Sequence, residues 1–500
     1  TLANLFYLPS SPTLFNAGKT REQLSSCFLL DSPEDSLDSI YKNYRDIAFL
    51  SKFSGGIGVS YSRIRSRGSW IHGTGGPSNG IVPFLKTLDS SVKAVNQGGK
   101  RKGACCVYLE TWHDDIEDYL SLRDTTGDEE SRTRNLNFAN WIPDLFMKKV
   151  KNGEEWYLFD PAKVSFVDSY GADFENEYEK AVKEKKYTRS VDARKLYTKM
   201  MKTLGETGNG WITFKDACNI KNNQTKNKKN VVHSSNLCVE ITQVNNKEET
   251  SVCNLGSINL AKFFKEDGFC YLSKIDWNAL ENTISIAVKQ LDRVIDINFY
   301  TIPETKKSNS KWRPVGLGVM GFQDLLFKMK LSFESVEAKQ ITEKLMSFIY
   351  FHALKESCEL AKKNGKHENF EETWASEKVF QFDLWGGLGE HSYYSLEQWN
   401  SLKEDVAKYG LRNSMLLAIA PTATIGLIAG VTECIEPQGS NLSKREVASG
   451  DFLQCNFYLQ EELKKQGLWT KEIISKIKEY EGSIQKIEEI PDHIKEIFKT

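Results

Sequence analysis

The chain has 500 residues, of which 40% are hydrophobic and 27% are charged, a balance typical of a globular protein that buries a sizeable core. Its 66 Lys and Arg residues nearly cancel its 67 Asp and Glu residues, which leaves a net charge of −1. This balance excludes the broad positive field that binds a nucleic-acid backbone. We therefore expect no nucleic acid polymer as a partner, and any nucleotide ligand would be a small one held in a pocket.

The sequence also lacks the patterns of membrane and secreted proteins. No apolar run approaches the ~18 residues that span a membrane, and the N-terminal residues Thr1-Leu2-Ala3-Asn4 do not form a signal peptide. These features predict a soluble, cytoplasmic protein with no membrane contact. Because the chain lacks an initiator Met and residues 496–500 fall inside a helix-like pattern, we also expect a fragment of a longer protein.

Predicted helices and strands alternate along the chain. Residues 36–52 carry apolar side chains at helical spacing, and Asp35 or Ser36 can cap the helix start. Further helices are predicted at 277–295 and 336–363. Short apolar runs between helices predict strands at 27–30, 58–61, 104–109, 211–214, 315–319 and 415–420. This order favours an α/β protein with a mostly parallel sheet, either open or closed into a barrel.

The ten cysteines are too sparse for a disulfide scaffold. None belongs to a Cys-x-x-Cys pair, which argues against a zinc ribbon or a thioredoxin-type site, and we predict no bound metal. The default interpretation of each cysteine, including the adjacent pair Cys105-Cys106, is a small buried apolar side chain.

One segment carries reactive groups at regular spacing. If the loop around residues 233–241 is extended, Asn236, Cys238 and Glu240 point to one side, because alternate side chains of an extended chain share a face. An amide, a thiol and a carboxylate would then stand in one row. The alternative is a half-buried strand edge whose polar residues face water.

Residues 236–241, Asn-Leu-Cys-Val-Glu-Ile, resemble the active-site loop of ribonucleotide reductases. Several other segments resemble that family in the same order, at 11–18, 25–29, 54–58, 63–65, 97–104, 252–257, 421–425 and 435–437. The resemblance covers nearly the whole chain. It implies a ten-stranded α/β barrel made of two antiparallel five-stranded halves, with the cysteine loop threaded through the centre.

The resemblance also implies catalytic roles. Cys238 would become a thiyl radical that takes the 3′ hydrogen of the ribose, Glu240 would act as general base on the 3′ hydroxyl, and Asn236 would hold the ribose hydroxyls. Cys27 and Cys253 would be the reducing pair, a disulfide made and broken in each turnover.

Substrate binding is assigned in the same way. A run of Thr and Gly is weak evidence for a phosphate site by itself, although hydroxyls and backbone N–H groups at a helix start suit an anion. The family pattern implies substrate contacts from Ser11, Ser26, Gly55, Gly56, Pro421, Thr422, Ala423, Thr424 and Ile425.

Allosteric control of specificity is implied as well. Asp35, Ser36 and Arg65 resemble the binding site for a deoxynucleotide or ATP effector. The glycine-rich stretch 72–80 resembles one communicating loop, and 97–103 resembles the second, with Gln97 and Arg101 directed at the substrate base. A solvated basic turn is the alternative for residues 100–102.

The resemblance implies several partners. Class I reductases take the radical from a metal-containing small subunit, which we favour, and class II enzymes take it from adenosylcobalamin; no cofactor is expected in this chain itself. Further expected partners are ribonucleoside diphosphates, thioredoxin or glutaredoxin as reductant, and a second copy that forms a homodimer through helices around 36–52 and 83–96. We expect a catalytic barrel over 1–455 that includes the effector site, and a helical appendage over 456–500. The family's N-terminal ATP cone and C-terminal cysteine tail are not in this sequence.

Two other classes of protein are alternatives to a reductase. Residues 316–321 match the dinucleotide-binding pattern Gly-x-Gly-x-x-Gly, but a single match is weak and the preceding segment is a poor strand. A reductase-like protein that serves only as a binding scaffold should have lost a cysteine of the set or Glu240, and all are present.

Overall fold

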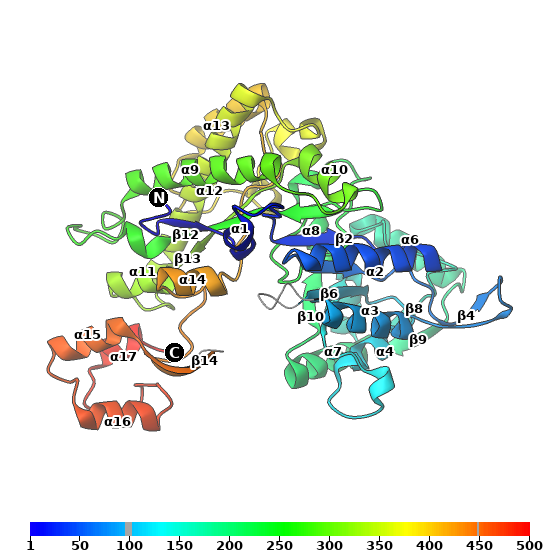
Figure 1. Cartoon of the computed structure of the whole chain (residues 1–500), viewed down its shortest axis with the longest axis horizontal. Coiled ribbons are helices and arrows are strands. Elements are labelled where there is room, and N and C mark those ends of the chain that lie inside the picture. Colours follow the sequence, from blue (N-terminus) through cyan, green and yellow to red (C-terminus); the bar gives the residue numbers. More distant parts are fainter. Residues whose placement is uncertain (96–102, 448–449) are drawn as a thin grey trace.

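The computed structural model describes residues 1–95, 103–447 and 450–500. The fold is mixed α/β, with two larger sheets beside each other and a small helical lobe below one of them (Figure 1). The predicted specificity residues Gln97 and Arg101 lie outside the described residues.

The first sheet has six strands and is mostly parallel, as predicted. In spatial order its strands are β10 (Trp211–Phe214), β7 (Leu136–Ile142), β6 (Ala104–Glu110), β3 (Gly56–Ser60), β2 (Cys27–Leu30) and β11 (Ser251–Cys253). The first five run parallel, and β11 is antiparallel to β2. Helices α2 (Leu37–Lys52) and α3 (Val82–Ala94) share one apolar core with these strands.

The second sheet contains β1 (Tyr7–Pro9), β12 (Leu255–Asn259) and β13 (Gly316–Met320). β12 is antiparallel to β1 and parallel to β13. A single parallel bridge between Leu317 and Leu417 adds the segment around 417 to the edge of β13. Helices α9 (Trp277–Ile297), α11 (Phe322–Met329), α12 (Val336–Asn364) and α13 (Leu396–Tyr409) pack with this sheet in a second core.

One residue, Asn254, joins the two sheets along the chain. It lies between Cys253, the last residue of β11, and Leu255, the first residue of β12. Its amide donates to Asn309 Oδ1 at 3.0 Å and to the Pro314 carbonyl at 2.9 Å, and its Oδ1 accepts from Ser25 at 2.9 Å. The two sheets are therefore held at a fixed relation beside Cys253.

The other elements connect or cover these sheets. They are α1 (Ser11–Asn16), β4 (Arg67–Ile71), β5 (Gly76–Asn79), α4 (Ile116–Leu120), α5 (Asp144–Asn152), β8 (Glu155–Leu158), α6 (Gly171–Lys183), β9 (Arg189–Asp192), α7 (Ala193–Thr207), α8 (Lys215–Ile220), α10 (Pro303–Trp312), α14 (Ala423–Ala429), β14 (Leu442–Val447), β15 (Gly450–Cys455), α15 (Phe457–Lys465), α16 (Lys471–Glu479) and α17 (Asp492–Ile497). The last three helices form their own apolar cluster, which reaches the second sheet's helices through Phe327 stacked on Phe498.

The helix predictions at 36–52, 277–295 and 336–363 are confirmed as α2, α9 and α12, and Ser36 caps α2 by accepting the Ser39 N–H at 3.3 Å. The strand predicted at 415–420 is wrong as a regular strand, because only Leu417 forms a bridge. Among the described residues, no helix is long and apolar enough to cross a membrane.

Candidate active site

The loop that carries Cys238 lies directly against β3. An added Cβ at Gly58 would meet the Ser235 carbonyl oxygen at 1.9 Å, and one at Gly56 would meet Leu237 at 3.1 Å. Both glycines therefore clear the space through which the loop passes. Sequence reasoning missed Gly58; the alternate glycines of Gly56-Ile57-Gly58 were the available signal, since they remove side chains from one face of a strand.

The loop is not extended, and this part of the prediction is wrong. Residues 237–239 form a turn, with Val239 at a positive φ of 72°. The turn nevertheless brings two of the predicted groups together, because the Asn236 amide donates to Glu240 Oε2 at 2.7 Å. Asn236 Oδ1 accepts the Ile241 N–H at 3.1 Å, which closes the turn. Asn236 and Glu240 are therefore brought together by a hydrogen bond across a turn and not by pointing to the same side of an extended segment.

Tyr108 supports the loop from β6 and was also missed by the sequence reasoning. Its hydroxyl donates to the Asn236 carbonyl oxygen at 2.6 Å, and its ring packs edge-on against Trp141. No spacing in the sequence connects residues 108 and 236. Only the parallel order of the strands brings them together.

Burial and hydrogen bonding both act on the pKa of the Glu240 carboxyl group. Burial raises the pKa of Glu240, while the Asn236 amide opposes that rise by stabilising the carboxylate. A carboxyl group with a raised pKa is a stronger base once it is deprotonated. Cys238 is exposed, whereas Cys27 and Cys253 are buried.

Cys27 and Cys253 are directly opposed on antiparallel strands β2 and β11. Opposed residues of such strands have Cα atoms about 4.5–5.5 Å apart, within the roughly 4.4–6.8 Å that a disulfide spans. Both side chains are buried, and the two sulfurs are not joined in a disulfide. Burial raises the pKa of Cys253 well above its usual range, and negative charge on Cys27, Glu240 or Cys238 raises it further. The structure thus brings together all three predicted cysteines and Glu240.

The segments predicted to bind phosphate converge only in part. Ile425 of α14 packs in one apolar cluster with Leu8 and Met320. Two residues after Leu8, Ser10 accepts a hydrogen bond from Ser26 at 2.5 Å, so the start of α14, Ser11 and Ser26 lie along the end of β1.

Other predicted substrate residues have structural partners of their own. The Thr422 hydroxyl accepts the Cys434 N–H at 2.7 Å. An added Cβ at Gly55 would meet the Phe28 ring at 2.5 Å, and one at Gly56 would lie 3.1 Å from Cys27 Sγ. Close packing requires glycine at both positions.

The predicted effector residues lie together at the start of α2. Arg65 donates through Nε to Asp35 Oδ2 at 2.7 Å and through its backbone N–H to Asp35 Oδ1 at 3.3 Å. Ser36 is the next residue and caps the helix. The stretch 72–80 forms the turn and second strand of the β4–β5 hairpin.

Comparison with known proteins decides the family. The family model of the ribonucleotide reductase barrel domain matches residues 25–500. This chain belongs to the ribonucleotide reductase family of large subunits. Over its whole length it is 44% identical to a ribonucleoside-diphosphate reductase subunit alpha of Chlamydia pneumoniae, covering 48% of that protein. It is 41% identical to the large chain of Schizosaccharomyces pombe, covering 60%, and 42% identical to the large subunit of variola virus, covering 63%. The chain thus spans about half to three fifths of these reductases.

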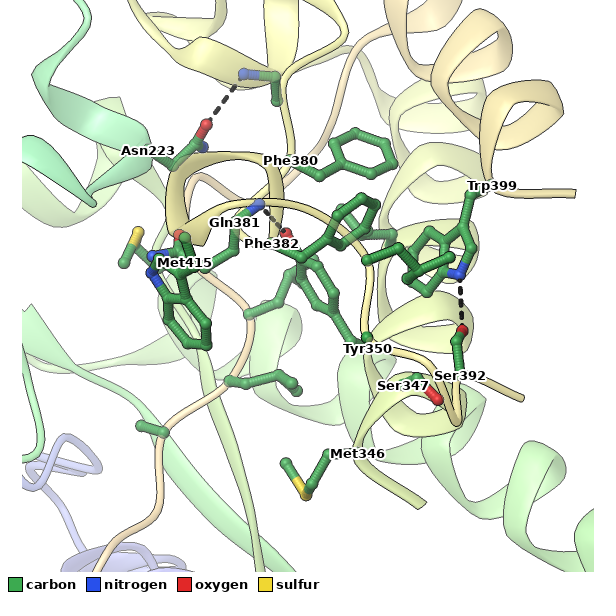
Figure 2. Close-up of a pocket in the computed structure, with 18 of the residues that line it drawn as sticks. Asn223, Met346, Ser347, Tyr350, Phe380, Gln381, Phe382, Ser392, Trp399 and Met415 are labelled. Atoms are coloured by element: carbon green, nitrogen blue, oxygen red, sulfur yellow. Dashed lines mark hydrogen bonds between the residues drawn. The ribbon is translucent and has the colours of Figure 1, made fainter. Parts of the chain in front are cut away.

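A cavity of about 750 Å³ opens on one side of the reductase loop and is shown in Figure 2. Its wall is mainly aromatic and aliphatic. Tyr350 comes from α12, Trp399 from α13 and Phe380 from the segment between these helices, and Met415 comes from the segment that forms the bridge to β13. Glu240 and Thr242 reach it from the loop. None of the described residues that line it is Lys or Arg, and its lining includes the carboxyl groups of Glu240 and Glu343.

The Gly-x-Gly-x-x-Gly match has a different explanation in this reductase fold. Gly316 and Gly318 lie within β13 rather than in the turn after a strand. An added Cβ at Gly316 would meet Leu255 at 2.5 Å, and one at Gly318 would meet the Ala418 carbonyl at 2.4 Å. The glycines leave room for neighbouring chain segments, and the dinucleotide-binding interpretation of this pattern is wrong.

Proposed function

We propose that this chain forms the catalytic core of a ribonucleoside-diphosphate reductase, which converts ribonucleotides to 2′-deoxyribonucleotides for DNA synthesis. The observation that carries the proposal is the convergence of the opposed pair Cys27–Cys253 with the loop of Asn236, Cys238 and Glu240. A buried pair of thiols beside an exposed thiol and a carboxylate is suited to a reaction that needs two electrons and a base.

In the proposed reaction, Cys238 as a thiyl radical takes the 3′ hydrogen of the ribose, and Glu240 accepts the 3′ hydroxyl proton. The 2′ hydroxyl leaves as water. Cys27 and Cys253 give two electrons and two protons and become a disulfide, so that one ribonucleotide and two thiols yield one deoxyribonucleotide, one disulfide and one water. Cys238 then returns a hydrogen atom to C3′ and becomes the thiyl radical again, and Glu240 returns the proton to the 3′ oxygen. Asn236 holds the carboxylate of Glu240 and the ribose hydroxyls in reacting geometry.

The substrate would lie with its phosphates near Ser11, Ser26 and the segment 421–425. This assignment is supported by the packing of Ile425 on Leu8 and by the Ser10–Ser26 hydrogen bond, which bring these segments to one end of β1. We also propose Gly55 and Gly56 as substrate contacts, which is supported by the hydrogen bond from the Gly56 N–H to the Ser26 carbonyl oxygen at 3.0 Å. We propose Asp35, Ser36 and Arg65 as effector contacts for a deoxynucleotide or ATP.

The proposed fold of the complete core is a closed ten-stranded barrel. Five parallel strands, β10 to β2, would form one half, and the sheet of β12 and β13 the other, running antiparallel to it. The continuity of β11 and β12 through Asn254 supports this closure. Residues 1–455 would form this catalytic unit and 456–500 an appendage, in keeping with the separate apolar cluster of α15 to α17.

We propose that the radical comes from a metal-containing small subunit rather than from adenosylcobalamin. The relatives' names, subunit alpha, large chain and large subunit, support a second type of subunit. A homodimer through α2 is supported by Leu37, Tyr41 and Phe49, which are 64%, 58% and 47% exposed on that helix and include an i, i+4 pair. Thioredoxin or glutaredoxin would supply the electrons that restore the thiols.

The test is reduction of CDP to dCDP by the complete large subunit with its small subunit and a dithiol reductant. Cys238→Ser should abolish dCDP formation while nucleotide binding, measured by equilibrium dialysis, stays close to wild type. Cys27→Ser or Cys253→Ser should stop multiple turnover. Normal dCDP formation by the Cys238→Ser protein would overturn the proposal.

A further inference from the structure

His233 lies at the base of the active-site loop and joins the loop's two ends. Its backbone N–H donates to Asn245 Oδ1 at 3.2 Å, and its ring Nδ1 lies 2.7 Å from the Asn245 carbonyl oxygen. Residues 233 and 245 flank the turn that holds Asn236 and Glu240, and a bridge between Ser235 and Thr242 lies just inside them. His233 is 5% exposed, so water does not compete for these contacts.

Both ring nitrogens of His233 face hydrogen-bond acceptors. Nδ1 faces the Asn245 carbonyl, and Nε2 lies 2.8 Å from Asp168 Oδ1. A neutral imidazole has one N–H and can donate to only one of them, whereas the imidazolium donates to both. The geometry therefore calls for the protonated ring.

The surrounding charges favour that protonated state. Asp31 Oδ1 lies 3.7 Å from Nδ1, and Arg63 binds Asp31 at 3.1 Å and Asp168 at 2.6 and 2.8 Å. Arg63 also approaches Nε2 at 3.3 Å. Burial alone would lower the pKa of His233, but Asp31 and Asp168 outweigh burial and the repulsion from Arg63, so the pKa is raised.

One further charged group acts on this cluster. Glu110, on β6, interacts with His233 through charge, and it is neutralised by Lys215, whose ammonium lies 2.8 Å from both of its oxygens. The cations His233, Arg63 and Lys215 therefore balance the anions Asp31, Asp168 and Glu110. Loss of the His233 proton would leave a net negative charge beside the loop base.

We propose that protonated His233 is a positioning residue that closes the base of the Asn236–Glu240 loop, and that the loop loosens when the ring loses a proton. The proposal rests on the proposed function for its effect on turnover, but not for its effect on the loop. The protonated ring donates to both Asn245 and Asp168 at pH values below its raised pKa. As pH rises through that pKa the neutral ring can donate to only one of them, so the loop base is held less firmly.

The first experiment measures amide hydrogen exchange in peptides covering 231–245, using the complete large subunit. His233→Gln, which can donate to only one side, should speed exchange there by about tenfold while β6 stays protected. His493→Gln is the matched control, because His493 is exposed on α17, and it should leave exchange in 231–245 unchanged. Wild-type exchange rates in the His233→Gln loop would overturn the proposal even if the enzyme assay had failed.

The second experiment uses Asp168→Asn, because Asp168 has a side chain that is 66% exposed and its replacement spares the core. The amide no longer favours the ring proton, so the pH at which the loop loosens should fall by about one unit. In the CDP assay kcat should lose its alkaline activity at correspondingly lower pH, with KM changed little. An unmoved pH dependence of both exchange and kcat would overturn the titration of His233 as the cause.

Discussion

Gly58 faces the carbonyl oxygen of Ser235 with no room for even a methyl group, since an added Cβ would lie 1.9 Å from that oxygen. The neighbouring atom is backbone, so it cannot move aside as a side chain would. The active-site loop is therefore seated on a strand whose backbone it touches. Its position depends on the absence of a side chain as much as on any hydrogen bond.

Gly58→Ala should accordingly destabilise the protein by about 1–3 kcal/mol and reduce CDP turnover by displacing the loop. The midpoint of urea unfolding and kcat would be measured together. Gly205→Ala is the control, because Gly205 lies inside α7 with open space around it, and alanine there should stabilise slightly. Equal unfolding midpoints and turnover for Gly58→Ala and wild type would contradict the close approach.

Asn236 should set the acid limb of the pH–rate profile. Its amide, 2.7 Å from Glu240 Oε2, stabilises the carboxylate and holds down a pKa that burial raises. In Asn236→Ala the pKa of Glu240 should rise further, so kcat, which needs the deprotonated base, should fall away at higher pH than in wild type. The measurement is kcat against pH with saturating CDP. An acid limb at the wild-type pH would remove Glu240 as the controlling base.

Removing only one partner of the buried Lys215–Glu110 ion pair should destabilise the protein more than removing both. Both side chains are fully buried, and Glu110 also accepts from Trp112 Nε1 at 2.7 Å. Lys215→Met leaves a buried carboxylate without its cation, which should destabilise by about 3–5 kcal/mol. The loss should shrink at acidic pH, where Glu110 can take up a proton, because burial raises its pKa.

Adding Glu110→Gln to Lys215→Met should recover most of that stability, because glutamine still accepts from Trp112 and carries no charge. Urea unfolding of wild type, both single variants and the double variant completes the cycle. A double variant as unstable as the sum of the single ones would mean that the two residues act independently.

Alkylation should separate exposure from function among the thiols. Cys270 is exposed, and hydrogen bonds from Ser273 lower its pKa, so iodoacetamide should modify it first. Cys238 is also exposed and should follow, whereas buried Cys27 and Cys253 should react slowly. Peptide mapping alongside the CDP assay should show that inactivation follows the labelling of Cys238 and not of Cys270. Inactivation that follows Cys270 would contradict the proposed site.

Much of the architecture could be predicted from local pattern. The apolar stripe of 36–52 and the short runs at 27–30 and 211–214 follow helix and strand periods, and each forms the expected element. The segment 415–420 has a strand-like composition, yet its pairing depends on β13, which is distant in the sequence, and only Leu417 forms a bridge. Composition does not reveal such a partner.

The site divides in the same way. Asn236, Cys238 and Glu240 are close in sequence, so their grouping could be predicted, although a turn and not an extended strand unites them. The contacts of Tyr108 with Asn236 and of Asp168 with His233 join distant segments. The first contact depends on the order of the strands and the second on the position of the loop before α6. Neither can be predicted from the spacing of residues in the sequence.

Because Asn254 connects β11 to β12, Cys253 lies at the junction between the two sheets. A disulfide between Cys253 and Cys27 would cross-link β11 and β2 beside that junction. It would be buried, since the two residues are only 1% and 4% exposed. A folded redox protein is too bulky to bring its own sulfur to such a place. We therefore expect thioredoxin or glutaredoxin to reduce this disulfide indirectly, through a flexible peptide segment whose thiols can reach the buried sulfurs.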